Sequence, residues 1–114
     1  MNELFLGVDT SNYTTSVSCV SSEGIVFERR TMLSVPLGER GLRQSDAVFQ
    51  HVKNLPPLID ALFAAVDRRT VAVVGVSVKP TAEEESYLPV FLAGRLAAVS
   101  LANALGVPYF ETTH

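Results

Sequence analysis

The first third of the chain alternates short apolar runs with polar turns. Leu4 to Val8 is an apolar run of strand length, and Thr14 to Val20 is rich in β-branched residues, so both are predicted as strands. Ile25 to Leu33 is a third predicted strand, which follows the turn residues Ser21 to Gly24. Because the connections are short, the three strands are expected to form an antiparallel meander.

One long helix is predicted in the middle of the chain. Its apolar positions recur at helical spacing and define one face, which consists of Val48, Val52, Leu55, Ile59, Leu62 and Val66. The apolar phase continues across Pro56 and Pro57, so one bent helix is expected rather than two. Ser45 or Asp46 is the expected N-cap. His51 lies off the apolar face and is expected at the helix surface.

The second half of the chain alternates strands with a helix. Val71 to Val78 is apolar at nearly every position, which is typical of a central parallel strand covered by helices on both faces. A helix is predicted from Tyr87 to Leu105, with Pro89 in its first turn and Gly106 directly after it, and a short strand from Val107 to Glu111. The resulting order β-β-β-α-β-α-β describes a mixed α/β sheet. It fits the ribonuclease-H-like fold, which also forms the lobes of actin-like ATPases.

Composition and charge narrow the possible function classes. With 114 residues, of which 47% are hydrophobic, the chain is expected to fold as one packed domain. The formal net charge of −3 argues against general electrostatic binding of nucleic acid. A single cysteine, Cys19, excludes an internal disulfide and a cysteine-based metal cage. The N-terminus does not have the pattern of a signal peptide and no apolar stretch is long enough to cross a membrane, so a cytoplasmic protein is expected.

The stretch GVDTSNYTTS, residues 7–16, places one carboxylate and several hydroxyl groups directly behind the first predicted strand. Open α/β sheets bind ligands at the carboxyl edge of their strands, so Asp9, Thr10 and Ser11 are candidate cofactor-binding residues. The same residue types also form a common turn in which the aspartate caps its own backbone. The position at the end of the first strand favours ligand binding. His114 follows the last predicted strand and is a candidate metal ligand, although one histidine does not make a metal site.

Three segments resemble the N-terminal part of the glycoprotease family, historically named O-sialoglycoprotein endopeptidases. They are LGVDTSNYTTSVSCV (residues 6–20), GERGLRQSDAVFQHVKNLPPLI (38–59) and GVPYFETTH (106–114). The best-understood members of this family synthesise the tRNA nucleoside threonylcarbamoyladenosine. The resemblance implies an actin-like ATPase fold of two ribonuclease-H-like lobes, of which this chain, as a truncated fragment, supplies most of the N-terminal one.

The resemblance also implies the cofactors of the full-length parent, which are a divalent metal (zinc or iron) and an adenine nucleotide. His114 matches the first histidine of the family's His-x-x-x-His metal motif. The fragment alone is expected to be inactive and to bind neither cofactor tightly. tRNA is expected as a partner of the full-length parent only.

Two departures from the family pattern are visible. Members that modify tRNA carry acidic residues where this chain has Tyr13 and Thr14. Their glycine-proline-glycine loop after the central strand is replaced here by residues Lys79 to Glu85. Both departures favour a divergent paralogue.

Three functions remain open at this point. The first is the N-terminal lobe of a metal-dependent threonylcarbamoyl transferase, with Asp9, Thr10 and Ser11 facing the cleft. The second is a non-catalytic paralogue that acts as a dimerising scaffold, through self-association or with partner proteins of the same pathway. A ribonuclease-H-like nuclease is the least favoured, because a two-metal site needs several acidic residues and only Asp9 is well placed. A protease is not supported, since the chain has no complete metalloprotease motif.

Overall fold

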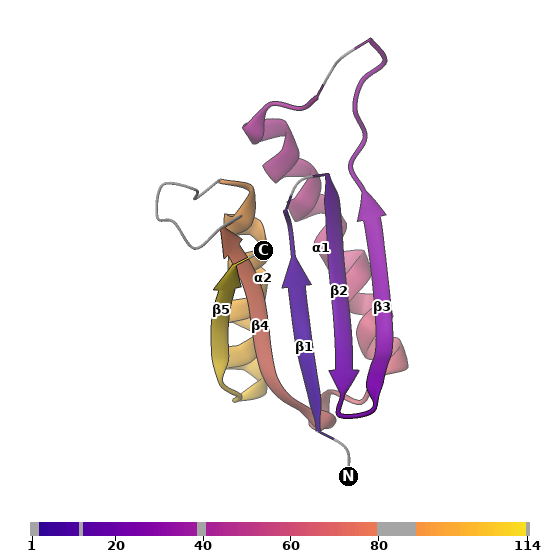
Figure 1. Cartoon of the computed structure of the whole chain (residues 1–114), viewed down its shortest axis with the longest axis vertical. Helices are drawn as coiled ribbons and strands as arrows, with labels where there is room; N and C mark the ends of the chain where they lie inside the picture. The colour runs from indigo at the N-terminus through magenta and orange to yellow at the C-terminus, as the bar shows by residue number, and fades with distance from the viewer. Residues whose placement is uncertain (1–2, 12, 39–40, 80–88, 114) are drawn as a thin grey trace.

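The fold is a five-stranded mixed sheet with two helices packed on one of its faces. The computed structural model describes residues 3–11, 13–38, 41–79 and 89–113. Its elements are, in chain order, β1 (Leu4–Asp9), β2 (Thr14–Ser21), β3 (Gly24–Met32), α1 (Gln44–Ala65), a 3-10 turn (Arg68–Thr70), β4 (Val71–Lys79), α2 (Val90–Leu105) and β5 (Tyr109–Thr113) (Figure 1). The order of strands and helices predicted from the sequence is confirmed.

The strands lie in the order β3-β2-β1-β4-β5. β1, β2 and β3 pair antiparallel and form the predicted meander. β4 pairs parallel with β1 on one side and with β5 on the other, so the segment from Val71 to Val78 is central, as predicted. Each connection into a parallel strand contains a helix. Such a crossover is the usual way to bring the chain back to the end of the sheet at which the next parallel strand must start.

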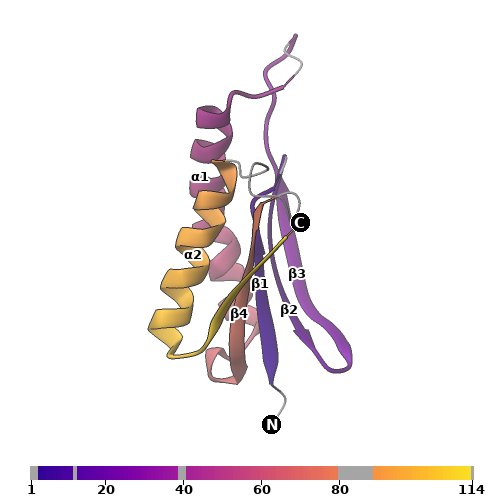
Figure 2. The ribbon, with the colours of Figure 1, turned by 60° about the vertical axis from the view of Figure 1, so that its left-hand side comes forward.

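The prediction that helices cover both faces of β4 is wrong for the part of the chain that the structure describes. α1 and α2 lie on the same side of the sheet (Figure 2). Val74 and Val76 point into the core beneath these helices and are almost fully buried. Gly75 and Ser77 alternate with them and border a hollow on the opposite side. The sequence of β4 suggested burial on both faces because Gly75 and Ser77 are small and hardly interrupt the apolar run. In the structure, helices pack on only one of its faces.

α1 buries a face that is shifted from the predicted one. Its buried residues are Ala47, His51, Leu55, Leu58 and Leu62, whereas Val52 of the predicted face is 48% exposed. The shift arises because a polar residue, His51, occupies a buried position in the N-terminal half of the helix. Pro56 and Pro57 lie within α1, and the prediction of one helix across them is confirmed.

The helix ends differ in how well the sequence predicts them. α1 begins at Gln44 after Arg43, whose side chain makes no capping hydrogen bond, so the prediction of Ser45 or Asp46 as N-cap is wrong. Asp46 instead lies in the first turn, where a negative charge interacts favourably with the helix dipole. α2 ends as predicted at Gly106, whose φ of 71° is left-handed.

α2 packs closely on the sheet through small side chains. Ala93, Gly94, Ala98 and Ala102 are its small buried residues. Phe91 is also buried, as its apolar character suggests, whereas Phe49 on α1 is exposed. Neither helix described by the structure is long and apolar enough to cross a membrane.

Candidate functional site

Asp9 is the last residue of β1 and lies at the carboxyl edge of the sheet. Its Oδ1 accepts a hydrogen bond of 2.7 Å from the backbone N–H of Ser11, which is the aspartate turn considered as the alternative interpretation. Asp9 also borders a hollow of about 340 Å³ on the open face of the sheet. The two interpretations are therefore compatible, because the side chain both orders the turn and borders the hollow.

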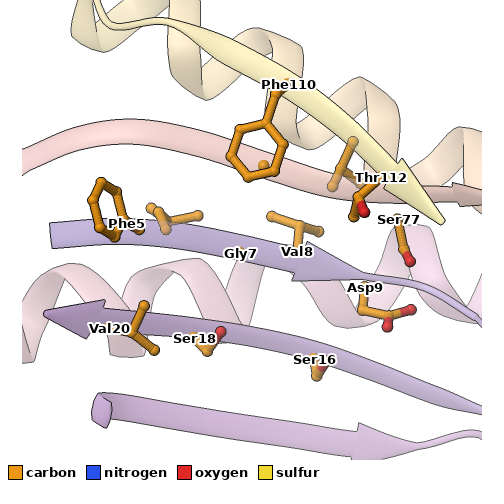
Figure 3. Close-up of a pocket in the computed structure, with 13 residues that line it drawn as sticks. Phe5, Gly7, Val8, Asp9, Ser16, Ser18, Val20, Ser77, Phe110 and Thr112 are labelled. Carbon is orange, nitrogen blue, oxygen red and sulfur yellow. The ribbon is translucent and has the colours of Figure 1, made fainter. Parts of the chain in front are cut away.

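The strand registers place polar side chains in a row beside Asp9 (Figure 3). Asp9 pairs with Ser16 of β2, and Ser16 pairs with Arg30 of β3. On the other side, Val8 pairs with Val76, which puts Ser77 next to Asp9, and Ser77 pairs with Thr112 of β5. We call this set the polar row; its members are Arg30, Ser16, Asp9, Ser77 and Thr112. One hydroxyl group lies on one side of the Asp9 carboxylate and two lie on the other side. This arrangement suits a ligand with several hydroxyl or phosphate oxygens.

Thr10 and Ser11 do not border this hollow. Thr10 has no exposed surface, and its Oγ1 donates to the carbonyl of Val90 at 2.8 Å and accepts from the N–H of Gly94 at 3.2 Å. These two bonds join the end of β1 to the first turns of α2. Ser11 is 6% exposed and bonds to Asp9 through its backbone. A ligand-binding role for the two residues stays a prediction.

The predicted metal ligand His114 lies outside the residues that the structure describes. Within the described ranges, no three side chains among His, Cys, Asp and Glu come together as a metal site would require. Burial raises the pKa of the Cys19 thiol to about 11, so this residue is a thiol rather than a reactive thiolate near neutral pH. Of the loop that replaces the family's glycine-proline-glycine segment, residues 80–85 also lie outside the described part.

The prediction that His51 lies at the helix surface is wrong. His51 is fully buried, and its Nδ1 lies 2.8 Å from the hydroxyl of Thr15. Its spacing of four residues from both Ala47 and Leu55 could have shown that it faces the sheet. Ser77 and Thr112 were also missed as site residues. Their signal was weaker, because only the alignment of parallel strands brings them beside Asp9.

Comparison with known proteins identifies the fold. No protein-family model and no curated protein matches the sequence. Among solved structures, YeaZ from Pseudomonas aeruginosa superposes with a TM-score of 0.66 over 97% of this chain, at 18% identity. The chain shares the fold of YeaZ. A second Pseudomonas aeruginosa structure, of an uncharacterised protein with similarity to peptidase YeaZ, gives a TM-score of 0.65 over 97% of this chain at 19% identity.

A more distant structural similarity is found to RuvC. RuvC from Thermus thermophilus matches 96% of this chain and 63% of its own with a TM-score of 0.52, at 13% identity. The ribonuclease-H-like fold predicted from the sequence is thus confirmed. This chain spans 44% of the length of YeaZ and 43% of the second relative.

Proposed function

We propose that this chain is the N-terminal lobe of a glycoprotease-like protein that binds a nucleotide and a metal ion, related to the tRNA threonylcarbamoyladenosine transferase. The observation that carries the proposal is the polar row, in which Asp9 lies between Ser16 and Ser77 at the carboxyl edge of the sheet. The fold shared with YeaZ and the three segments that resemble the family support it. The activity of a complete two-lobe protein belongs to the proposal, since the chain spans 44% of YeaZ.

The polar row fits a nucleotide better than it fits a metal ion. The hydroxyl groups of Ser16, Ser77 and Thr112 can donate to phosphate oxygens, and the Asp9 carboxylate can accept from ribose hydroxyl groups. Thr10 would act indirectly, by holding the end of β1 against α2, and Ser11 by fixing the turn at Asp9.

A metal site is not completed by the described residues. Asp9 is the one carboxylate of the polar row, and the described residues include no group of three metal-ligating side chains, whereas catalytic zinc sites use three protein ligands. No reaction step is therefore assigned to a metal here. His114 remains the proposed metal ligand, with the other ligands supplied from outside this lobe.

Nitrogen-15 NMR of the chain titrated with AMP tests the nucleotide site. We expect the amide signals of Asp9, Ser16, Ser77 and Thr112 to move, because these residues form the polar row. Asp9→Asn should reduce the shifts, and Ser100→Ala on the exposed side of α2 serves as the matched control. If the amides of the polar row do not move, or if Asp9→Asn shifts like the control, the nucleotide proposal fails.

A second candidate function, the non-catalytic scaffold, is favoured by the outer surface of the helices. Leu92 and Leu96 on α2 are 48% and 66% exposed. With Val99 they border a shallow hollow of about 360 Å³. Phe49 and Val52 are further exposed apolar residues on α1. Exposed apolar side chains of this kind gather at protein–protein interfaces.

The scaffold function is tested by sedimentation of the chain mixed with a purified, metal-bearing member of the glycoprotease family. We expect a complex with the wild-type chain. Leu96→Glu should abolish this complex, because the substitution places a negative charge in the proposed apolar contact. Phe5→Ala changes the opposite face of the sheet and should leave the complex intact. A complex that tolerates Leu96→Glu would contradict this function.

A further inference from the structure

Phe110 on β5 exposes half of its side chain next to the polar row. Its exposed fraction is 50%, and it borders the same hollow as Asp9. Gly75 is the β4 residue that pairs with Phe110, and a Cβ at Gly75 would collide with the tip of the ring. The ring therefore lies directly over the backbone of β4. Figure 3 shows that it turns its other face toward the open side of the sheet.

The exposed face of the Phe110 ring lies two strand positions from the polar row. Phe110 pairs with Gly75, and the next pair on the same face of the sheet is formed by Thr112 and Ser77. Two positions along a strand correspond to about 7 Å. This distance is comparable with the one that a ribose places between its base and its 5′-phosphate. A base on the Phe110 ring would thus leave its ribose and phosphate beside Asp9, Ser77 and Thr112.

We propose that Phe110 is the base-stacking residue of the nucleotide site, and that the ligand is a purine nucleoside monophosphate. This inference rests on the nucleotide site proposed above, to which it adds the base and the class of nucleotide. Bases stack favourably on aromatic side chains through their flat faces. Gly7 pairs with Gly75 on β1 and carries no side chain. The second ring of a purine has room over Gly7, which the single ring of a pyrimidine would not reach.

The charge at the hollow favours a nucleotide with one phosphate. Among the described residues that line the hollow, Asp9 is the only charged one. Arg30, at the end of the polar row, is already paired with Glu28 at 3.3 Å. Sites for longer phosphate chains normally gather several cationic groups. The hydroxyl groups of Ser77 and Thr112 suffice to bind a single phosphate group.

Phe5 provides a comparison on the same face of the sheet. It is 46% exposed and borders the same hollow. However, Phe5 and Asp9 are four positions apart on β1, which corresponds to about 13 Å. This is about twice the separation between Phe110 and the polar row. A base on Phe5 would therefore leave its phosphate short of the polar row.

Nitrogen-15 NMR titrations of the chain with AMP, CMP and ribose 5-phosphate test this inference. Phe110→Leu should raise the dissociation constant of AMP about tenfold, because it removes the aromatic face and keeps an apolar side chain. It should leave the affinity for ribose 5-phosphate unchanged, and Phe5→Leu, the matched control, should change neither. AMP should bind more tightly than CMP. The proton signals of bound adenine should shift upfield with the wild-type chain and not with Phe110→Leu, because only the wild type places a ring beneath the base.

Gly75→Ala moves the ring without removing it. The new Cβ would meet the far end of the Phe110 side chain, which can swing away from β4, so AMP binding should weaken and ribose 5-phosphate binding should persist. Circular dichroism checks that each variant is folded, and Gly75→Ala keeps the test valid if Phe110→Leu is not.

The outcomes separate this inference from the function on which it rests. If ribose 5-phosphate moves the amides of the polar row but binds as tightly as AMP, the base-stacking role of Phe110 is overturned and the polar row stands. An AMP affinity that is lowered equally by Phe110→Leu and Phe5→Leu also overturns that role. CMP that binds as tightly as AMP overturns the purine class. If neither AMP nor ribose 5-phosphate moves the amides of the polar row, the nucleotide site itself fails and this inference fails with it.

Discussion

Thr15 Oγ1 and His51 Nδ1 lie 2.8 Å apart in the interior between β2 and α1, and neither side chain has exposed surface. Asn54 of α1 donates to the same hydroxyl at 3.2 Å. Buried polar groups are costly unless they are bonded, so such a cluster favours one position of the helix over others. The antiparallel half of the sheet is thus joined to α1 by polar contacts as well as by the apolar core.

His51→Ala should lower the free energy of unfolding by about 2–4 kcal/mol, since it removes a buried ring and a hydrogen-bond partner of Thr15. Urea denaturation followed by circular dichroism measures this change. Phe49→Ala lies two residues away at a position that is 65% exposed, and it should change stability by less than about 0.5 kcal/mol. Equal effects of the two substitutions would mean that the cluster does not stabilise the fold.

Gly94→Ala should destabilise the protein although alanine is the better helix former. A Cβ at Gly94 would lie 2.8 Å from Thr10 Oγ1 and 3.2 Å from Val76 Cγ2, where the backbone of α2 touches the sheet. Overpacking of this kind costs about 1–3 kcal/mol, which exceeds the gain of about 1 kcal/mol from helix propensity. The measurement is the midpoint of thermal unfolding, with Ser100→Ala on the exposed side of the same helix as control. A higher midpoint for Gly94→Ala would show that α2 can move away from Thr10 without loss.

Local patterns explain which parts of this structure were predictable. The strands β1, β2 and β4 follow from runs of apolar and β-branched residues, and Asp9 could be placed at the carboxyl edge because it directly follows such a run. The residues that lie beside Asp9 in the folded sheet could not be predicted in the same way. Strand registers, which depend on tertiary packing, align Arg30, Ser77 and Thr112 in one row with Asp9.

The side of the sheet on which a helix packs is also set by tertiary structure. The apolar residues of α1 fit two neighbouring helical faces, and the buried Thr15–His51 contact belongs to the one that packs on the sheet. A histidine counts as polar in a periodicity, so the pattern alone favours the wrong face. The sequence pattern is equally uninformative at Gly75 and Ser77. Both residues are small, so they do not indicate that one face of β4 is left open.

Tyr109 should ionise at unusually high pH. Its hydroxyl donates to Glu111 Oε2 at 2.5 Å, and Arg95 Nε donates to the same oxygen at 2.6 Å. Burial and, secondly, the bond to Glu111 raise the pKa of Tyr109 to about 12. The folded value lies above the unfolded value of about 10, so this contribution to stability is complete below pH 10 and is lost as the pH rises through about 12.

Ultraviolet absorbance of tyrosinate measures this ionisation. A step near pH 12 should be present in the wild-type chain and absent in Tyr109→Phe. Glu111→Gln should lower the pKa of Tyr109 only in part, because burial is the larger cause and persists in that variant. A step in Glu111→Gln that falls fully to the ordinary value would assign the whole effect to the carboxylate.

The chain alone should bind zinc, iron or manganese no more tightly than a single exposed imidazole does. The described residues bring together no group of three metal-ligating side chains, and Asp9 is the one carboxylate of the polar row. His114 would add one nitrogen, and the remaining positions around the ion would be filled by water, whereas catalytic zinc sites use three protein ligands. Calorimetric titration of the chain with each metal measures the affinity. Wild type and His114→Ala should differ slightly, and Asp9→Asn should match the wild type. Tight binding of one metal ion per chain, lost in His114→Ala, would show instead that a complete metal site exists within these 114 residues.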